Sequence, residues 1–417
     1  MDHMKLYKRE KYLKKIRGFY HDTDIIKVIS GVRRCGKSCL MQMIADELTK
    51  SGIPQENILF YNLDRYGFKN IRTADDLENL LFQKEYPSGT KYIFIDEIQN
   101  VDGFEPVINA LREEGEFSIF VTGSNSYLLS GELATKLTGR YIEFELFTLS
   151  FDEYIGMKKM YGKPISDHLE EELDSYILEG GFPRAVQYDS LGDKRTYVRS
   201  VIDEIFKKDI RRRVQIRHKD TFDKVQTFIM NNFGATMSLS SILDELEKEN
   251  IRIKRDTLNR YIQVLLDAKI IYECKRFDLK SKKAIRGEQK YYLSDLSFYF
   301  INNVDNRINY GSVLENIVYQ YARSCNYDVS IGRVGNLECD FIFRDNMMNY
   351  AYIQVAMTIM NSEDTEDREY RPLEMISDNY PKYVLTRNDP IQRRNGIIHL
   401  NIPKLIVEGR RFEYKFD

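Results

Sequence analysis

The chain has 417 residues, which is too many for one ordinary hydrophobic core and favours two to four domains. Its composition, 42% hydrophobic and 30% charged with a net charge of −2, fits a soluble folded protein. No stretch approaches eighteen consecutive apolar residues, the polar and basic first residues lack the apolar centre of a secretory signal, and the five cysteines follow neither metal nor disulfide spacing. We therefore expect a cytoplasmic protein with no membrane span.

The first chemical motif follows a short β-branched run at 25–29, which predicts a buried parallel strand. The motif reads G-x-x-x-x-G-K-S and leads into a helix-like pattern. In this context glycines let backbone N–H groups wrap phosphates, a lysine neutralises the β- and γ-phosphates, and a serine hydroxyl ligates Mg²⁺. We expect ATP to be bound by Gly31, Val32, Arg33, Arg34, Cys35, Gly36, Lys37, Ser38 and Cys39, with Ser38 on the metal.

Two acidic residues end a later strand. The apolar run at 92–95 leads directly into Asp96 and Glu97. We expect Asp96 to hold Mg²⁺ through water and Glu97 to orient and deprotonate the attacking water.

A further strand, expected at 117–121, opens into Thr122, Gly123, Ser124 and Asn125. A polar side chain at this point can reach the γ-phosphate or its water. Asn125 is slightly favoured over Ser124, and a loop that satisfies its own backbone is an equally good reading of each residue.

Together, the motifs at 31–38, 93–97 and 122–126 and the later Leu-Thr-Gly-Arg-Tyr at 137–141 resemble the AAA+ superfamily. More narrowly, they resemble predicted bacterial and archaeal ATPases with an uncharacterised C-terminal region. The resemblance implies that Arg140 contacts the nucleotide of a neighbouring subunit in a homo-oligomer. It also implies that Arg184, in Gly-Gly-Phe-Pro-Arg, senses the γ-phosphate from a lid. A surface salt bridge is the alternative for each arginine.

The expected fold class is α/β: a parallel-sheet P-loop AAA+ core at 1–150, a helical lid at 151–205, a winged helix-turn-helix at 206–300 and a C-terminal α/β domain at 301–417. The winged helix is inferred from three helical patterns followed by two strand-like runs, an order that resembles that module.

Its charge favours a nucleic-acid partner. Residues 251–290 contain seven lysines and five arginines against five acidic residues, a net charge of +7. Such a cluster can follow DNA phosphates through counterion release. The candidate contacts are Lys254, Arg255, Arg260, Lys280, Lys282, Lys283 and Arg286. The alternatives are a winged helix that serves as a dimerisation or lid module and a basic face that is simply solvated.

The last hundred residues resemble the restriction-endonuclease fold, whose active site combines an acid on a helix, an Asp on one strand and Glu-x-Lys on the next. Glu315 and Asp340 match this pattern, Gln354 replaces the second acid, and Ala356 stands where the lysine belongs. Without that lysine, metal affinity and water activation should both fall, so a degenerate, binding-only domain is favoured over an active nuclease. Lys382 or Arg368 could supply a displaced charge.

These patterns predict an AAA+ ATPase that hydrolyses Mg-ATP and acts on DNA or another macromolecule. Two alternatives remain: an ATP-gated DNA nuclease, and a nucleotide-switched scaffold that binds a protein partner without affinity for DNA.

Overall fold

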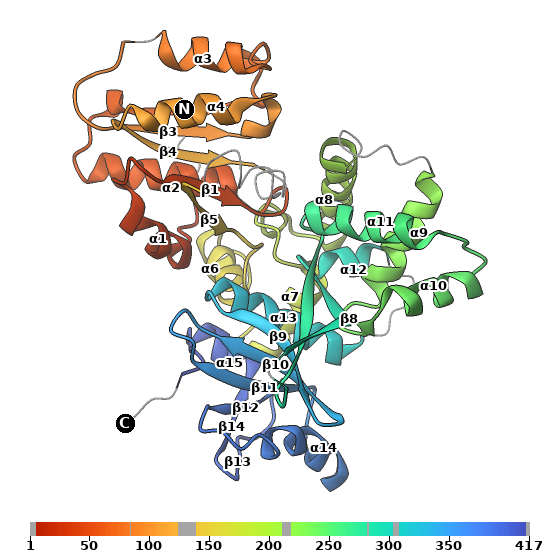
Figure 1. Cartoon of the computed structure of the whole chain (residues 1–417). Helices are drawn as coiled ribbons and strands as arrows, with labels where there is room; N and C mark the ends of the chain where they lie inside the picture. Colours follow the sequence, from red (N-terminus) through yellow and green to blue (C-terminus); the bar gives the residue numbers. More distant parts are fainter. Residues whose placement is uncertain are drawn as a thin grey trace. The chain divides into compact units, whose positions relative to one another are not determined.

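The computed structural model describes residues 6–83, 85–123, 139–210, 218–281, 283–302 and 308–413. The chain divides into two compact units. Unit 1 comprises Met1–Phe147 with Asp267–Lys269, and unit 2 comprises Thr148–Leu266 with Ile270–Asp417. Each unit is described by itself below (Figure 1). No helix among these described residues is both long enough and apolar enough to cross a membrane.

Unit 1 is built on a five-stranded parallel sheet in the order β2-β3-β4-β1-β5. The strands are β1 (Ile26–Ser30), β2 (Ile58–Asn62), β3 (Lys91–Asp96), β4 (Phe117–Thr122) and β5 (Tyr141–Glu145). The helices are α1 (Glu10–Ile16), α2 (Lys37–Lys50), α3 (Ala74–Phe82) and α4 (Phe104–Glu113). The three central strands are buried along their whole length, as expected of a sheet covered on both faces.

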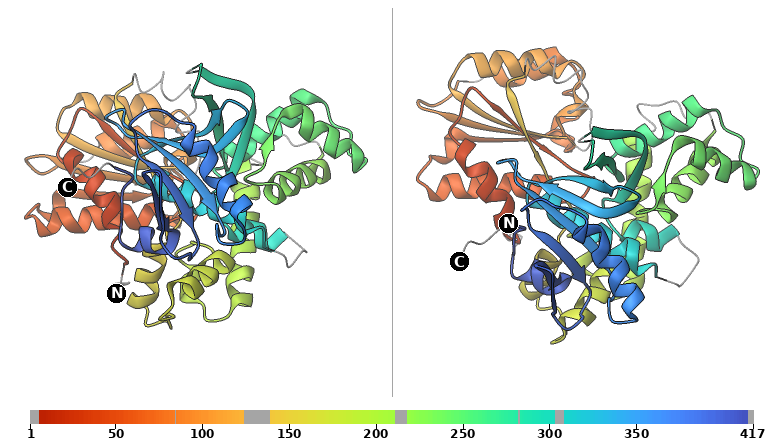
Figure 2. Two further views of the ribbon diagram at one scale, coloured as in Figure 1. Left: turned by 90° about the horizontal axis from the view of Figure 1, so that it is seen from below. Right: turned by 60° about the horizontal axis from the view of Figure 1, so that its bottom comes forward.

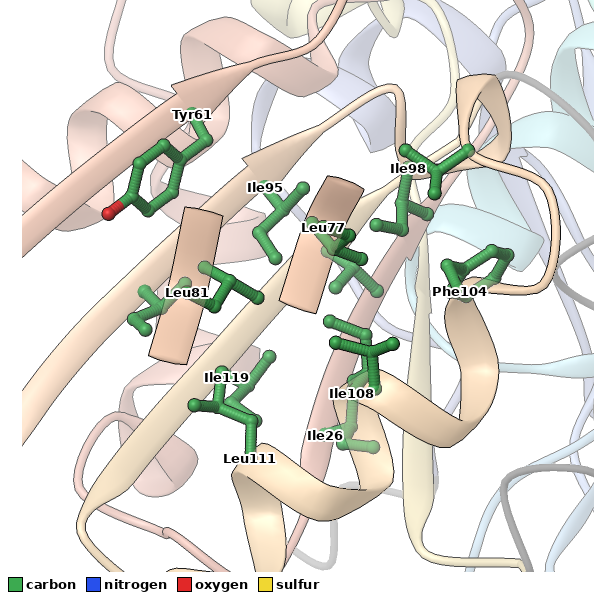
Figure 3. Packing of buried hydrophobic residues seen from close by; sticks show 14 of the residues in the cluster. Ile26, Tyr61, Leu77, Leu81, Ile95, Ile98, Phe104, Ile108, Leu111 and Ile119 are labelled. Atoms are coloured by element: carbon green, nitrogen blue, oxygen red, sulfur yellow. The ribbon is translucent and has the colours of Figure 1, made fainter. Parts of the chain in front are cut away.

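One face of this sheet packs against α3 and α4 (Figure 3). Alternate residues of the strands, including Ile26, Ile95 and Ile119, meet Leu77 and Leu81 from α3 and neighbours from α4. All five of these side chains are fully buried. The twofold alternation along each strand therefore matches the apolar stripes of two helices and holds the sheet flat against them.

The other face carries a ladder of aromatic rings. Phe60, Phe94 and Phe120 come from three adjacent strands, with ring centroids 5.7 and 4.7 Å apart and nearly parallel planes. Helix α2, which follows the phosphate-loop motif, lies on this side of the sheet in Figure 1. The ladder fixes the lateral order of the strands that carry the polar motifs at their ends.

Unit 2 combines helices with a second, larger sheet (Figure 2). The helices are α6 (Phe151–Met160), α7 (Leu169–Glu179), α8 (Leu191–Glu204), a π-helix (Ile205–Ile210), α9 (Lys219–Asn231), α10 (Leu239–Lys248), α11 (Arg255–Asp267), α12 (Ser297–Asn302), α13 (Tyr310–Ser324), α14 (Glu363–Glu374) and α15 (Ile402–Val407). The strands are β6 (Thr236–Met237), β7 (Ile271–Asp278), β8 (Lys283–Leu293), β9 (Asp328–Val334), β10 (Leu337–Arg344), β11 (Tyr350–Ala356), β12 (Lys382–Thr386), β13 (Arg393–Arg394) and β14 (Ile397–Asn401).

The nine strands of unit 2 form one sheet, in the order β13-β14-β12-β11-β10-β9-β7-β8-β6. The strands of the expected winged helix join those of the expected C-terminal domain through a parallel pairing of β7 with β9, in which Arg276 is opposite Ile331. The expected order of three helices and two strands is present from α9 to β8, with the two-residue strand β6 added against β8.

The expected domain boundary near residue 300 therefore differs from the observed structure. The strands assigned by sequence to a separate winged helix continue into the C-terminal sheet, and the expected lid belongs to the same compact unit. Pairing between strands about fifty residues apart depends on tertiary contacts, which explains why composition gave no sign of it.

Candidate functional site

The phosphate-loop motif adopts a compact turn between β1 and α2. Gly31 has φ 141° and Gly36 has φ 109°, both in the region that favours glycine. A Cβ atom on Gly31 would lie 2.1 Å from the carbonyl oxygen of Leu146, so a side chain has no room there. Helix α2 begins at Lys37, which places its N-terminal N–H groups directly behind the loop.

The loop is held together by two buried cations. Lys37 donates from Nζ to the carbonyl oxygens of Gly31 (3.0 Å) and Val32 (3.1 Å). Arg9 donates to the carbonyl oxygens of Cys35 (3.3 Å) and Phe147 (2.8 Å). Arg9 lies outside the phosphate-loop motif, 26 residues before Cys35. Its role was therefore not predicted from the sequence.

The carboxylate of Asp96 is buried at the end of β3 and fixed from both sides. Thr122 on β4 donates its hydroxyl to Oδ1 (2.5 Å), and Asn62 on β2 donates its amide to Oδ2 (2.8 Å). Neither the contact of Asn62 nor that of Thr122 with Asp96 was predicted from the sequence. The sequence did contain a clue, since each of these three strands ends in a polar residue. The carboxyl ends of parallel strands meet at one edge of the sheet, so these polar side chains could have been expected to lie close together.

Glu97 follows in a strained, left-handed conformation, φ 60° and ψ 46°. Its backbone N–H donates to the Thr122 hydroxyl (3.0 Å). Its Oε2 accepts from Gln99 (2.5 Å) and lies 3.9 Å from the guanidinium of Arg33 in the phosphate loop. The side chains of Arg33 and Glu97 are only 9% and 14% exposed, so water screens their attraction less than it would at the surface. This charge pair connects the phosphate loop to the acid pair.

The loop and the acid pair lie at the same edge of the sheet. β1 ends at the loop, β3 ends at Asp96, and β4 lies between them. Burial raises the pKa of the Cys39 thiol in the first turn of α2, and the negative charge of Asp96 raises it further. Ser38 in that turn is exposed. A lysine, a helix N-terminus, a hydroxyl and a fixed carboxylate are the donor set that fits Mg-ATP.

Arg140 lies at the opposite edge of the sheet. Its carbonyl oxygen accepts from the N–H of Ile26, the first residue of β1, and Tyr141 is in register with Ile26. Its side chain is 52% exposed and lies 3.4 Å from Asp24, which also accepts from the buried Arg112 (2.6 Å). These three residues, with Thr23, Glu113 and Gly115, line a cavity of about 230 Å³.

Two other predicted site residues are not part of the described structure of unit 1. Asn125 and the alternative Ser124 lie outside the described residues. Arg184 belongs to unit 2, where it donates to the side chain of Gln187 (2.7 Å).

The basic cluster is partly exposed and partly consumed by ion pairs. Lys254, Arg255, Arg260, Lys280 and Lys283 are exposed, whereas Lys282 and the side chain of Arg286 lie outside the described residues. Arg276 pairs with Glu288 and Glu338, and Lys290 pairs with Glu315 and Glu338. The net charge counted from sequence therefore overstates the positive surface.

The structure brings the three residues of the expected nuclease remnant into one region, but only two of them contact the same cation. Glu315 on α13 and Asp340 on β10 are both within 4 Å of Lys290, at 3.0 and 3.9 Å. Gln354 instead donates to Glu369 (3.0 Å) and accepts from the backbone N–H of Asp340 (3.4 Å), so its amide is used within the protein. Ala356 packs in an apolar cluster with Ile342, Tyr352 and others.

Neither displaced charge considered from sequence reaches Asp340 in the contacts of the described residues. Lys382 donates to the carbonyl oxygen of Asp378 (3.3 Å), and Arg368 pairs with its neighbour Glu369 (2.9 Å). The cation near Asp340 is Lys290 on β8, which sequence analysis placed in another domain. Its only sequence signal was a lysine in an otherwise apolar strand end, Lys-Tyr-Tyr-Leu.

Comparison with known proteins agrees with the architecture of unit 1. Residues 23–155 match the sequence family described as "AAA domain", and residues 170–304 match a domain of unknown function (DUF8612). An uncharacterised protein of Haemophilus influenzae is 36% identical over 383 residues, which cover 91% of this chain and 92% of that protein. The uncharacterised protein MJ1544 of Methanocaldococcus jannaschii is 29% identical over 404 residues, covering 93% and 88%.

Among solved structures, the Walker-type ATPase PABY2304 of Pyrococcus abyssi aligns with a TM-score of 0.51 at 14% identity, covering 71% of this chain and 96% of that one. At this identity the likeness concerns the fold alone. The five-stranded parallel sheet with its flanking helices is a P-loop core of the AAA+ type, and the second sheet is an addition to it.

Proposed function

The chain belongs to the same family as the Haemophilus influenzae protein, and we propose that it is an AAA+ ATPase that hydrolyses Mg-ATP and couples hydrolysis to DNA binding. One observation carries the proposal: the phosphate loop follows β1 and the Asp96–Glu97 pair ends β3, two strands of one parallel sheet that are separated only by β4 and end at the same edge. Two motifs that are sixty residues apart in sequence thereby face the same space.

In this proposal the loop from Gly31 to Cys39 binds the phosphates. Its backbone N–H groups and the N-terminus of α2 face the negative charge. Lys37 exchanges its two carbonyl partners for phosphate oxygens, which are charged and therefore stronger acceptors.

Ser38 and Asp96 hold Mg²⁺, with Asp96 acting through water. When bound, Mg²⁺ supplies positive charge beside the β- and γ-phosphates. The hydrogen bonds from Thr122 and Asn62 hold the Asp96 carboxylate in a fixed orientation.

Glu97 orients the attacking water and takes its proton. Its Oε2 lies 3.9 Å from the Arg33 guanidinium, which holds the carboxylate beside the phosphate loop. Asn125 is assigned the contact with the γ-phosphate or its water, as the sequence indicates, and Arg184 the sensing role from the lid.

Arg140 acts on the nucleotide of another subunit. It precedes the first residue of β5, whereas the phosphate loop follows the last residue of β1. A five-residue strand separates the two edges by about 16 Å at ~3.3 Å per residue. An arginine at this edge cannot reach its own ATP, so the proposal requires a homo-oligomer.

DNA binding is assigned to the helices and strands from α9 to β8, which we interpret as a winged helix-turn-helix. The supporting observation is the exposure of Lys254, Arg255 and Arg260 at the start and along one side of α11. Phosphate contacts of this kind are mostly independent of base sequence and weaken strongly with salt.

The test is ATPase activity measured against protein concentration, with and without duplex DNA, together with DNA anisotropy across a salt series. We expect specific activity to rise with concentration, DNA to change it, and log affinity to fall linearly with log salt. Activity without any response to DNA, and no DNA binding at low salt, would indicate a nucleotide-switched scaffold for a protein partner instead. Absence of hydrolysis at every concentration would refute the ATPase.

A further inference from the structure

A buried lysine of unit 2 lies among three carboxylates. Lys290 Nζ is 3.0 Å from Glu315 Oε2, 2.9 Å from Glu338 Oε1 and 3.9 Å from Asp340 Oδ1. The side chain of Lys290 is 6% exposed. The ammonium comes from β8 and the carboxylates from α13 and β10, so three elements meet at one cation.

Each of these carboxylates also accepts from a second protein donor. The Tyr292 hydroxyl donates to Glu315 Oε2 (2.8 Å), and the backbone N–H of Val355 donates to Asp340 Oδ2 (2.8 Å). Arg276 pairs with the second oxygen of Glu338. Each of the three carboxylates therefore has at least one donor besides Lys290, as expected of charges held in a mostly buried cluster.

We propose that Lys290 is a resident cation, whose ammonium takes the position that a divalent metal would take among Glu315, Glu338 and Asp340 and keeps this module free of metal. An ammonium presents three donors about 3 Å from its acceptors, whereas Mg²⁺ needs oxygens at about 2.1 Å on all sides. Among the described residues, no group of three or more acids, histidines or cysteines is arranged to hold a metal ion. The amide of Gln354 faces Glu369 and the Asp340 backbone instead.

The position of Lys290 has a consequence for the function of unit 2 that is independent of the nucleotide site in unit 1. The module that resembles a nuclease is not a metal-dependent nuclease, and its carboxylates serve to bind β8 to α13 and β10. It concerns unit 2, whereas the phosphate loop is in unit 1, so the ATPase proposal and this one succeed or fail separately.

The first experiment needs no change to Lys290. Mn²⁺ binding, followed by electron paramagnetic resonance without nucleotide, is compared between the unaltered chain and Asp340→Asn. We expect the two titrations to coincide, and neither protein to nick supercoiled DNA with Mn²⁺ or Mg²⁺. A binding component or a nicking activity that disappears in Asp340→Asn would overturn the proposal.

The second experiment removes the cation. In Lys290→Ala the carboxylates lose their counter-charge and gain space, so we expect one additional Mn²⁺ per chain and an unfolding temperature that rises with Mn²⁺. Asp340→Asn in the same background should abolish both gains. Lys275→Ala is the matched control, since Lys275 is an exposed lysine on the adjacent strand β7 that pairs with Glu273 at 3.4 Å.

Lys290→Arg retains the charge, and it should fold and bind no additional Mn²⁺. If Lys290→Ala does not fold, the comparison of the unaltered chain with Asp340→Asn still decides. A folded Lys290→Ala that binds no more Mn²⁺ than the Lys275→Ala control would contradict the proposal.

Discussion

At the scale of single residues, the proposed chemistry separates binding from turnover. Lys37 contacts the loop that receives the phosphates, whereas Glu97 lies beyond it and faces Arg33 and Gln99. Loss of the Lys37 charge should therefore weaken ATP binding, whereas loss of the Glu97 carboxylate should slow turnover.

We expect Lys37→Ala to lose ATP binding and Glu97→Gln to bind ATP while its turnover falls by about 10²- to 10⁴-fold, the usual contribution of a general base. Fluorescent ATP anisotropy measures the first property and phosphate release the second. Turnover at the unaltered rate in Glu97→Gln would remove Glu97 from the role of base.

Thr122 is the second residue whose effect can be predicted from its contacts. Its hydroxyl donates to Asp96 and accepts from the N–H of Glu97, so it holds both acids. Thr122→Val keeps the shape and removes both hydrogen bonds. We expect a loss of about 10- to 100-fold in turnover or Mg²⁺ affinity, with ATP binding retained.

Thr49→Val is the control for this prediction, because Thr49 is an exposed threonine on α2 whose hydroxyl contacts the carbonyl oxygen of Ala45 and the side chain of Gln55, away from the acid pair. Activity should depend on Mg²⁺ concentration normally in that variant. Equal losses in both valine variants would mean that the effect is on folding and not on the acid pair.

At the scale of secondary-structure elements, β1 carries a buried lysine that the sequence motif does not explain. Lys27 is fully buried, donates to the carbonyl oxygen of Asp22 (2.6 Å) and the hydroxyl of Ser118 (2.8 Å), and lies 4.7 Å from the ring centre of Phe120. Burial lowers its pKa to about 7 from an ordinary 10.5.

Because the unfolded chain holds this proton up to about pH 10.5 and the folded chain releases it near pH 7, the unfolded state binds more protons between these values. The free energy of unfolding of unit 1 should therefore rise with pH across this window, by at most about 1.4 kcal/mol per pH unit. Lys27→Met should flatten the slope.

Calorimetry measures this effect if the transition of unit 1 is first identified as the one that Mg-ATP shifts upward. The comparison of slopes between the unaltered chain and Lys27→Met cancels the contributions of other groups. A pH dependence that is unchanged in Lys27→Met would show that Lys27 retains its charge in the folded state.

At the scale of the whole molecule, the proposal depends on association between copies. Arg140 and the phosphate loop are at opposite edges of one sheet, so a complete site needs the loop of one copy and the arginine of another. Arg140→Ala and Lys37→Ala would each lose one half of that site.

Mixing the two inactive variants should therefore restore part of the ATPase activity, because sites form from the loop of Arg140→Ala and the arginine of Lys37→Ala. Phosphate release measured over a range of mixing ratios should show a maximum near equal amounts. If the mixture is no more active than the sum of its parts, or if Arg140→Ala alone is fully active, the trans role is wrong.

The sequence alone determined the parts of the fold that local patterns specify. A strand, a glycine loop and a helix in uninterrupted order predicted the β1–α2 turn, and apolar runs ending in polar residues predicted β3 and β4. Gly31 and Gly36 both have the positive φ that glycine adopts most readily, which explains why the loop needs glycine at these positions. Within unit 2 the succession of helices and strands from α9 to β8 was also predicted.

Only the tertiary structure decided which distant residues meet. Asn62, Thr122 and Arg33 join Asp96 and Glu97 because parallel strands end at one edge. The pairing of β7 with β9 merged two expected domains, and it brought Lys290 to Glu315 and Asp340. The residue pattern of one strand does not depend on which distant strand it pairs with or which distant charge it meets. Sequence spacing therefore cannot reveal these contacts.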